Sequence, residues 1–244
     1  MTHLPTYTFA KLRQQQLDKI TKPFRARGHK LKRCQQCLLA ASHCICDQIK
    51  ISPCTIDIMI LMHPKELLKP TNSGRLIADI LPHSSHIFLW SRTEPEPALL
   101  NFIKDKSRQC LLVFPADSDR EIYRSINVDT RLNKQPSSNK KLTLIMLDGT
   151  WKQARKMYNK SCWLEHIPCL SIEPPLAPNP MQKPNNYGLR QASAPHLSST
   201  CEAAAAALDS LGEIEASQAL NQYFQVFNRY YLASRANTLV ACRT

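Results

Sequence analysis

A carboxylate, a glycine, a hydroxyl and an indole follow one another directly at the end of an apolar run. These residues are Asp148, Gly149, Thr150 and Trp151, and the apolar run KLTLIML precedes them. Ligands in open α/β sheets bind beyond the carboxyl ends of the strands, which is where Asp148 would lie. Gly149 permits close approach of a backbone or ligand, and Trp151 offers an aromatic face to a ring or a cation. Taken alone, the four residues predict a ligand pocket.

A basic stripe follows this predicted pocket. Lys152, Lys156 and Lys160 recur every four residues with Arg155 beside them, so on a helix they would share one face. Such stripes are usually solvated, but this one adjoins the strand end, and we expect it to contact phosphates. The chain carries 32 Lys and Arg against 19 Asp and Glu, a formal charge of +13. That charge fits a polyanionic partner and, equally, a merely soluble basic surface.

Four cysteines lie within thirteen positions, in the segment CQQCLLAASHCIC. Cys34, Cys37, Cys44 and Cys46 follow a C-x2-C pattern and, six residues later, a C-x-C pattern. Four thiolates so close together can surround one tetrahedral Zn²⁺, which would order a segment too short to fold by burial. The spacing therefore predicts a structural zinc site held by the four cysteines, the simplest ligand set. The alternatives are a site in which His43 replaces one cysteine, reduced cysteines without metal, and a regulatory thiol pair.

Apolar runs alternate with amphipathic segments over the middle of the chain. The runs at 55–62, 86–90, 110–115, 141–147 and 169–172 are typical of strands, and the segments 73–81 and 97–106 have helical spacing. Strands that are apolar on both faces and separated by helices favour a mainly parallel α/β sheet covered on both sides. We predict no structure for the basic segment 1–33, and an exposed loop for 130–141.

The C-terminal part is predicted to be helical. Ser199 with Glu202 three residues later forms a capping-box pattern, and Gly212 is the predicted stop of that helix. Beyond it, aromatic residues recur at helical spacing, which favours core packing over a ligand site. At the front of the helix predicted for 73–81, Asn72 and Ser73 are candidate caps, and His63 is a structural or a functional histidine.

Several function classes lack support in the sequence. It contains no Walker loop, G-x-G-x-x-G, G-x-S-x-G or H-E-x-x-H motif, which argues against an ordinary NTPase, dehydrogenase, serine hydrolase or zinc protease. We see neither a signal-peptide pattern nor an apolar run of membrane-spanning length, so we expect a cytoplasmic protein without a membrane partner.

The order of these motifs resembles the DTW-domain family, in particular its tRNA-uridine aminocarboxypropyltransferases. From residue 33 to residue 208, the matching pieces are RCQQCLLAASHCIC, LMHPKE, PTNSGRLI, FLWSRT, VFPA, LDGTWKQARKM, YGLR and LSSTCEAAAAAL. The resemblance implies a SPOUT-like fold with a C-terminal knotted region, in a catalytic domain at 51–244 that follows a basic, zinc-binding element at 1–50. It also implies transfer of the 3-amino-3-carboxypropyl group of S-adenosylmethionine to N3 of a tRNA uridine, with release of methylthioadenosine.

The resemblance assigns roles to individual residues. It implies catalytic roles for Asp148, Thr150 and Trp151, with Asp148 either the general base for uridine N3 or a structural cap of the helix that begins near Trp151. The implied cofactor-binding residues are Pro115, Ala116, Leu147, Asp148, Gly149, Leu189, Arg190, Ser199 and Thr200. The implied RNA-binding residues are Lys152, Arg155, Lys156, Arg25, Arg27, Lys30 and Arg33.

Two other functions stay open at this point. One is a SPOUT-type RNA methyltransferase, because every carbon on the sulfonium of S-adenosylmethionine is electrophilic and geometry selects the one that reacts. The other is a zinc-containing RNA-binding protein without transfer activity, which charge and cysteines fit equally well. The sequence does not indicate an oligomeric state, a tRNA species or a particular uridine.

Overall fold

Six parallel strands form one sheet in the part of the chain that the structure describes. This computed structural model describes residues 8–21, 31–115, 125–126, 140–172 and 199–238. The strand order is β2-β1-β5-β3-β6-β4, and every neighbouring pair is parallel. The strands are β1 (Asp57–Met62), β2 (Ser85–Leu89), β3 (Arg108–Val113), β4 (Ser125–Ile126), β5 (Lys141–Asp148) and β6 (Cys169–Leu170). All five strands predicted from apolar runs are confirmed, whereas β4 has no such run and was not predicted.

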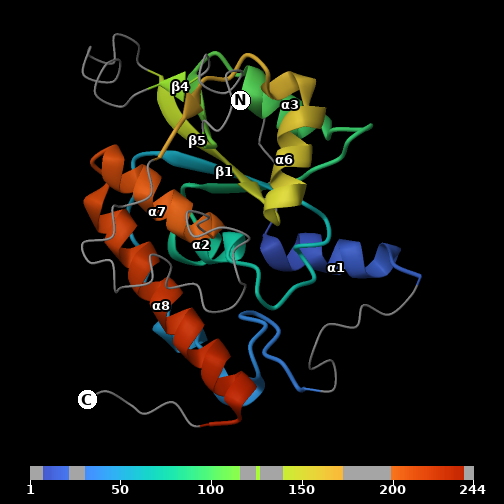
Figure 1. The fold of residues 1–244 in the computed structure, drawn as a ribbon, viewed down its shortest axis with the longest axis vertical. Coiled ribbons are helices and arrows are strands. Elements are labelled where there is room, and N and C mark those ends of the chain that lie inside the picture. Colours follow the sequence, from blue (N-terminus) through green and yellow to red (C-terminus); the bar gives the residue numbers. More distant parts are fainter. Residues whose placement is uncertain (1–7, 22–30, 116–124, 127–139, 173–198, 239–244) are drawn as a thin grey trace.

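Helices flank the sheet on both faces (Figure 1). They are α1 (Phe9–Lys19), α2 (Gly74–Ile80), α3 (Pro97–Lys104), α6 (Trp151–Lys160), α7 (Thr200–Ser210) and α8 (Ile214–Ala236), with 3₁₀ helices at Ala41–His43, Cys46–Gln48 and Cys162–Leu164. The capping box predicted for α7 is present, since Ser199 and Glu202 each accept a hydrogen bond from the other's backbone N–H. Gly212 follows α7 with a φ of 84°, a conformation that suits glycine and ends the helix as predicted.

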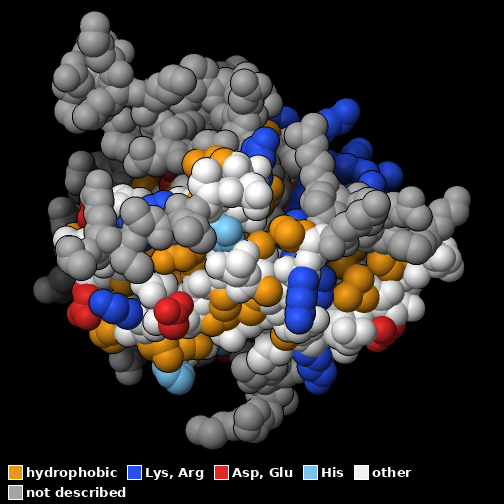
Figure 2. Space-filling model, turned by 90° about the horizontal axis from the view of Figure 1, so that it is seen from below, with side chains coloured by type: hydrophobic (Ala, Val, Ile, Leu, Met, Phe, Trp, Pro, Cys, Tyr) orange, Lys and Arg blue, Asp and Glu red, His pale blue; other side chains and the backbone are white. Residues whose placement is uncertain are grey.

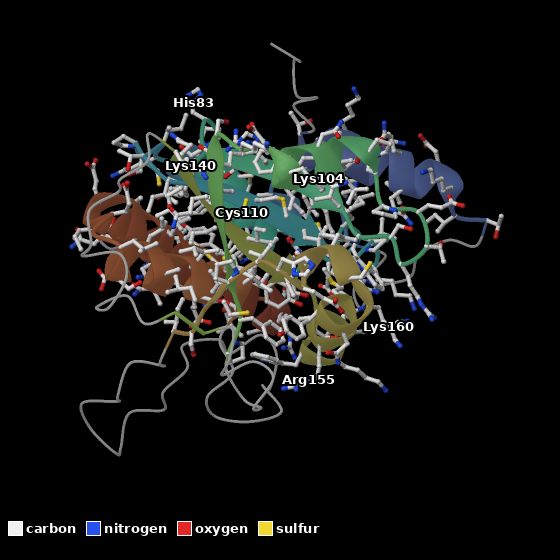
Figure 3. The ribbon with its side chains drawn as sticks, turned by 90° about the horizontal axis from the view of Figure 1, so that it is seen from above. His83, Lys104, Cys110, Lys140, Arg155 and Lys160 are labelled. Atoms are coloured by element: carbon white, nitrogen blue, oxygen red, sulfur yellow. The ribbon has the colours of Figure 1, made fainter. Side chains whose placement is uncertain are left out.

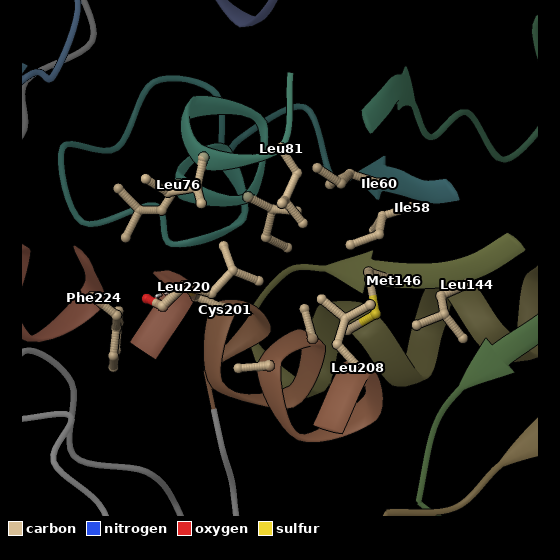
Figure 4. Packing of buried hydrophobic residues seen from close by; sticks show 14 of the residues in the cluster. Ile58, Ile60, Leu76, Leu81, Leu144, Met146, Cys201, Leu208, Leu220 and Phe224 are labelled. Atoms are coloured by element: carbon tan, nitrogen blue, oxygen red, sulfur yellow. Dashed lines mark hydrogen bonds between the residues drawn. The ribbon is translucent and has the colours of Figure 1, made fainter. Parts of the chain in front are cut away.

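The two faces of the sheet pack against different helices because successive residues of a strand point to opposite sides. On one face, Ile58, Ile60 and Met62 of β1 join a core with α2, α7 and α8 (Figure 4). On the other face, Met59 and Leu61 pack with α3 and α6. All six residues of β1 are buried, as expected for an interior strand of a parallel sheet.

The C-terminal aromatic stripe is part of the core, as predicted. Tyr223, Phe224 and Phe227 of α8 are buried in the first of these two clusters. The N-terminal elements pack into the same cluster, through Leu12 of α1 and through Cys37, Leu39 and Ile45 of the cysteine segment.

Some expectations fall outside the described residues. These are the exposed loop, whose residues up to 139 are not described, and the segment 173–198, which belongs to the C-terminal region expected to be knotted. Among the described residues, no helix combines the length and the apolar character that a membrane span requires.

Candidate functional site

The carboxyl ends of β1 and β5 form the point where the direction of the chain connections changes. From β1 the chain passes through α2 to β2 on one side, and from β5 it passes through α6 to β6 on the other. These two strands are neighbours, with Met62 opposite Asp148 in the register. In open α/β sheets such a switch point opens the crevice that binds ligands. The predicted pocket therefore lies where this topology favours one.

Asp148 joins the amino-terminal ends of two helices at this switch point. Its side chain is buried, with 3% of the residue exposed. Asn72, just before α2, donates from Nδ2 to Oδ2 at 2.5 Å, and Thr200, the first residue of α7, donates from Oγ1 to Oδ1 at 2.7 Å. Helix amino termini carry partial positive charge, so a carboxylate is favourable between them.

Gly74 makes this arrangement sterically feasible. A Cβ atom on Gly74 would lie only 2.6–2.9 Å from the carboxylate atoms of Asp148. Because Asn72 and Thr200 both hold that carboxylate, it has little freedom to move aside. Asn72 also caps α2, since its Oδ1 accepts from the backbone N–H of Arg75 at 2.9 Å. Ser73, the other candidate cap, makes no side-chain cap hydrogen bond.

Thr150 caps α6, which corrects the structural role suggested for Asp148. Thr150 Oγ1 accepts from Gln153 N at 3.3 Å, and Gln153 Oε1 accepts from Thr150 N at 2.7 Å. Thr150 is therefore the N-cap of the helix that begins at Trp151, and the Asp148 carboxylate binds the ends of α2 and α7. Trp151 packs on the α6 face of the sheet, with its ring centroid 6.1 Å from that of Phe114.

A second group of polar and aromatic side chains lies on the α6 face of the same sheet edge. His63 directly follows β1, and its backbone N–H donates to Asp148 O at 2.9 Å. The His63 ring stacks on Trp90, with centroids 5.7 Å apart and planes 25° apart. Lys156 Nζ lies 6.0 Å from the centroid of the Trp90 ring. Sequence reasoning missed this cluster, although its signal was present as a histidine directly after one predicted strand and a tryptophan at the end of the next.

The remaining predicted pocket residues lie in different environments. Leu147 is a core residue, Pro115 is partly buried, and Gly149 is partly buried beside Gln153. Ser199 is the N-cap of α7 and so stands next to Thr200 at the Asp148 site. Ala116, Leu189 and Arg190 lie outside the described residues.

The basic stripe is exposed along α6, as predicted. Lys152, Arg155, Lys156 and Lys160 are all solvent-exposed. In Figure 3, Arg155 and Lys160 extend outward from α6 in the lower half of the view, whereas Lys104 and Lys140 lie in the upper half, away from α6. Figure 2 shows another face, on which basic and apolar side chains are mixed and acidic ones are few.

The basic residues predicted near the N-terminus are only partly described. Arg25, Arg27 and Lys30 lie outside the described residues. Arg33 is partly buried, and its Nη1 donates to Leu38 O at 3.0 Å, within the cysteine segment. The Arg33 side chain therefore helps to hold the cysteine segment in its conformation.

The four predicted metal ligands lie together. The Sγ atoms of Cys34, Cys37, Cys44 and Cys46 all lie within 4.8 Å of one another. Three of the sulfur pairs are 3.5, 3.6 and 3.8 Å apart. Tetrahedral Zn–S bonds of about 2.3 Å place neighbouring sulfurs about 3.8 Å apart, so these four residues fit a zinc ion.

Fold and site together define a class of protein, namely an α/β protein with a ligand site at a sheet switch point beside an exposed basic helix. The family model for the DTW domain matches residues 31–232. This match covers most of the chain, which therefore belongs to the DTW-domain family. Membership of this family indicates a tRNA-modifying transferase. No solved structure matches the chain.

Proposed function

We propose that the protein transfers the 3-amino-3-carboxypropyl group of S-adenosylmethionine to N3 of a uridine in tRNA and releases methylthioadenosine. The observation that carries this proposal is the Asp148 carboxylate at the β1/β5 switch point, adjoining the exposed basic helix α6. Membership of the DTW-domain family supports the same reaction. A SPOUT-like fold with a C-terminal knotted region and a cytoplasmic location belong to the proposal.

Asp148 is the proposed acceptor of the uridine N3 proton. Attack by N3 requires loss of this proton, and a carboxylate beside the crevice is a suitable acceptor. The N3 electron pair then forms the new N–C bond to the aminocarboxypropyl group. The bond between that carbon and sulfur breaks, its electron pair stays on sulfur, and neutral methylthioadenosine leaves.

The other residues of the site are proposed to bind and orient the substrates. Gly149, Ser199 and Thr200 border Asp148 and would contact S-adenosylmethionine, together with Pro115 and Leu147 and with Ala116, Leu189 and Arg190. Trp151 would present its ring to adenine, to the target base or to the sulfonium. Lys152, Arg155 and Lys156 would contact the RNA backbone, as would Arg25, Arg27, Lys30 and Arg33. Cys34, Cys37, Cys44 and Cys46 would hold a structural zinc ion, outside the reaction.

Labelled S-adenosylmethionine tests the reaction directly. The protein is incubated with tRNA and a donor that carries label either in the methyl group or in the aminocarboxypropyl group. We expect only the aminocarboxypropyl label in the RNA, with one methylthioadenosine released for each group transferred. Methyl label in the RNA would identify a methyltransferase instead. Binding of tRNA without any transfer would identify a non-catalytic RNA-binding protein.

A further inference from the structure

The environment of His63 fixes which ring nitrogen carries the proton. Nδ1 lies 3.4 Å from Gln153 Nε2 and 3.3 Å from the backbone N of Lys65. The Gln153 side chain cannot reverse freely, because its Oε1 accepts from Thr150 N in the capping box of α6. The amide nitrogen of Gln153 therefore faces Nδ1, and an amide nitrogen can only donate. With two donors directed at Nδ1, that atom is the acceptor and Nε2 carries the hydrogen.

The same environment keeps the ring neutral. Burial lowers the pKa of His63 below its usual value; Glu66 opposes this effect, and the charges of Lys65, Lys69 and Lys156 add to it. Protonation would also turn Nδ1 into a donor that faces two other donors. His63 thus presents an Nε2–H group without a positive charge, and within the described residues this Nε2 has no hydrogen-bond partner.

The ring is held in place beside the switch point. Trp90, on which it stacks, is itself anchored, because its Nε1 donates to Ser161 Oγ at 2.9 Å and its backbone N donates to Met62 O at 2.9 Å. Trp90 is 6% exposed. A donor fixed on a rigid element before the substrate arrives stabilises developing charge without having to reorganise.

We propose that His63 is a catalytic residue on the acceptor side of the reaction, whose Nε2–H donates a hydrogen bond to a carbonyl oxygen of the target uracil. This inference rests on the proposed function. Loss of the N3 proton spreads negative charge onto the two carbonyl oxygens that flank N3. A hydrogen bond to either oxygen stabilises this anion, and a neutral imidazole does so without giving up its own proton. His63 therefore begins and ends the step in the same protonation state.

His63 and Asp148 lie on opposite faces of the sheet, at the carboxyl ends of β1 and β5. Met62 is opposite Asp148 in the register, so these two side chains share a face. His63, the next residue, turns to the other face and stacks on Trp90. A uracil ring that lies beyond the carboxyl ends of β1 and β5 would meet the carboxylate from one side and the imidazole from the other. Lys156, on the same side as His63, would attract the phosphate next to that base.

Two substitutions at His63 distinguish loss of the Nε2–H donor from loss of the imidazole ring itself. In His63→Gln the amide nitrogen reaches approximately the position of Nε2, whereas in His63→Asn it reaches only that of Nδ1. We expect His63→Asn to lower kcat on the order of 100-fold, which is typical for loss of one donor to a developing oxyanion, with little change in the KM for tRNA. We expect His63→Gln to stay within about tenfold of wild type. Equal losses in both variants would overturn the proposal.

Nitrogen NMR of the ring tests the proposal independently of transfer. With ¹⁵N-labelled histidine, the His63 signals are those missing from His63→Asn. Near neutral pH we expect an uncharged ring with hydrogen on Nε2, and a shift of this Nε2–H signal when tRNA is added. A ring protonated on Nδ1, or no shift with tRNA bound, would refute the role of His63. Wild-type protein that transfers no group to tRNA would refute the proposed function instead. The NMR signal would still show whether the Nε2–H group of His63 contacts tRNA.

Discussion

Asp148 is the proposed base of the reaction, and its carboxylate also joins the ends of two helices. Asp148→Asn keeps the shape but removes the charge, and we expect transfer to fall at least about 100-fold, because a general base contributes about 10²- to 10⁴-fold. We expect the variant to unfold cooperatively, since an amide oxygen still accepts one of the two hydrogen bonds. The measurement is transfer of the aminocarboxypropyl label, together with thermal unfolding.

Thr200→Val is the matched control for Asp148→Asn. It removes the hydrogen bond from Thr200 Oγ1 and leaves the carboxylate intact. Transfer is compared as kcat at saturating S-adenosylmethionine, so that a weaker proposed contact of Thr200 with the donor appears in KM, and a proton acceptor should then keep most of its kcat. If Thr200→Val lost as much transfer as Asp148→Asn, the role of Asp148 would be to hold α2 and α7. Full activity in Asp148→Asn would exclude Asp148 as the base.

Asp57, at the opposite end of β1, makes the stability of the fold depend on pH. Burial raises the pKa of its carboxyl group, but hydrogen bonds from His86 and Arg108 and the charges of His86 and Lys141 outweigh burial and lower the pKa to about 2. The unfolded chain has the ordinary value of 3.8. The unfolded state therefore binds more protons between these values, and the stabilisation is complete above about pH 5 and lost as the pH falls towards 2.

Urea unfolding of Asp57→Asn checks this pH dependence. At pH 7 we expect a loss on the order of 2 kcal/mol, less than the value for a fully buried pair because Lys141 is partly exposed. The difference from wild type should shrink below pH 4. Asp105→Asn, an exposed carboxylate that also faces Arg108, should change the stability little. A difference that stayed constant down to pH 2.5 would contradict the role of Asp57.

At the scale of elements, the start of α6 depends on Thr150. Thr150→Ala removes the acceptor for Gln153 N, and we expect a loss of about 1 kcal/mol in the free energy of unfolding, the usual cost of an N-cap. Thr150→Ser keeps the hydroxyl and should behave as wild type. Urea unfolding and the transfer assay are measured on both variants. If Thr150→Ala, but not Thr150→Ser, lost much more transfer activity than its loss of folding stability explains, Thr150 would contact the substrate as well as cap α6.

The elements themselves were predictable because their signals are local. Apolar runs marked five strands, and the pattern of Ser199 with Glu202 marked the start of α7. The site was predictable only in part. Asp148 lies 76 positions from Asn72 and 52 from Thr200, and no local pattern states that such distant side chains meet. The close approach of Gly74 to Asp148 depends on the same long-range packing and was missed for the same reason.

At the scale of the whole molecule, the cysteine segment contacts the far end of the chain. Cys37 is buried in the core cluster that includes α8, and His43 Nε2 lies 2.9 Å from Thr238 O. Removing zinc with a chelator should therefore lower the melting temperature by several degrees. It should also speed hydrogen exchange in the last turns of α8, which hold no metal ligand.

Cysteine variants provide the control for the chelator experiment. Cys34→Ser removes a predicted ligand and should abolish stoichiometric zinc, with the same loss of stability. Cys162, exposed and outside the cluster, should tolerate Cys162→Ser with its zinc retained. Wild-type protein purified without zinc that folds as stably as the metal-supplemented protein would contradict the site.

RNA could be attracted by the overall positive charge of the protein or by the basic residues of α6 in particular. Two triple variants distinguish these two cases. The first replaces Lys152, Arg155 and Lys160 of α6 by alanine. The second replaces Lys104, Lys106 and Lys140, which are exposed and lie outside α6. Both lower the formal charge from +13 to +10, since each removes three cations. Lys156 is left in place because its contact with Trp90 would confound the comparison.

If α6 contacts phosphates of the tRNA, the triple variant of α6 should weaken tRNA binding. It should also reduce the slope of log K against log salt by about 2 to 3, nearly one for each lost contact. The second triple should leave that slope close to wild type. Equal changes in both triples would mean that the basic surface attracts RNA only through its overall charge, and that the position of α6 beside the Asp148 crevice does not guide the tRNA.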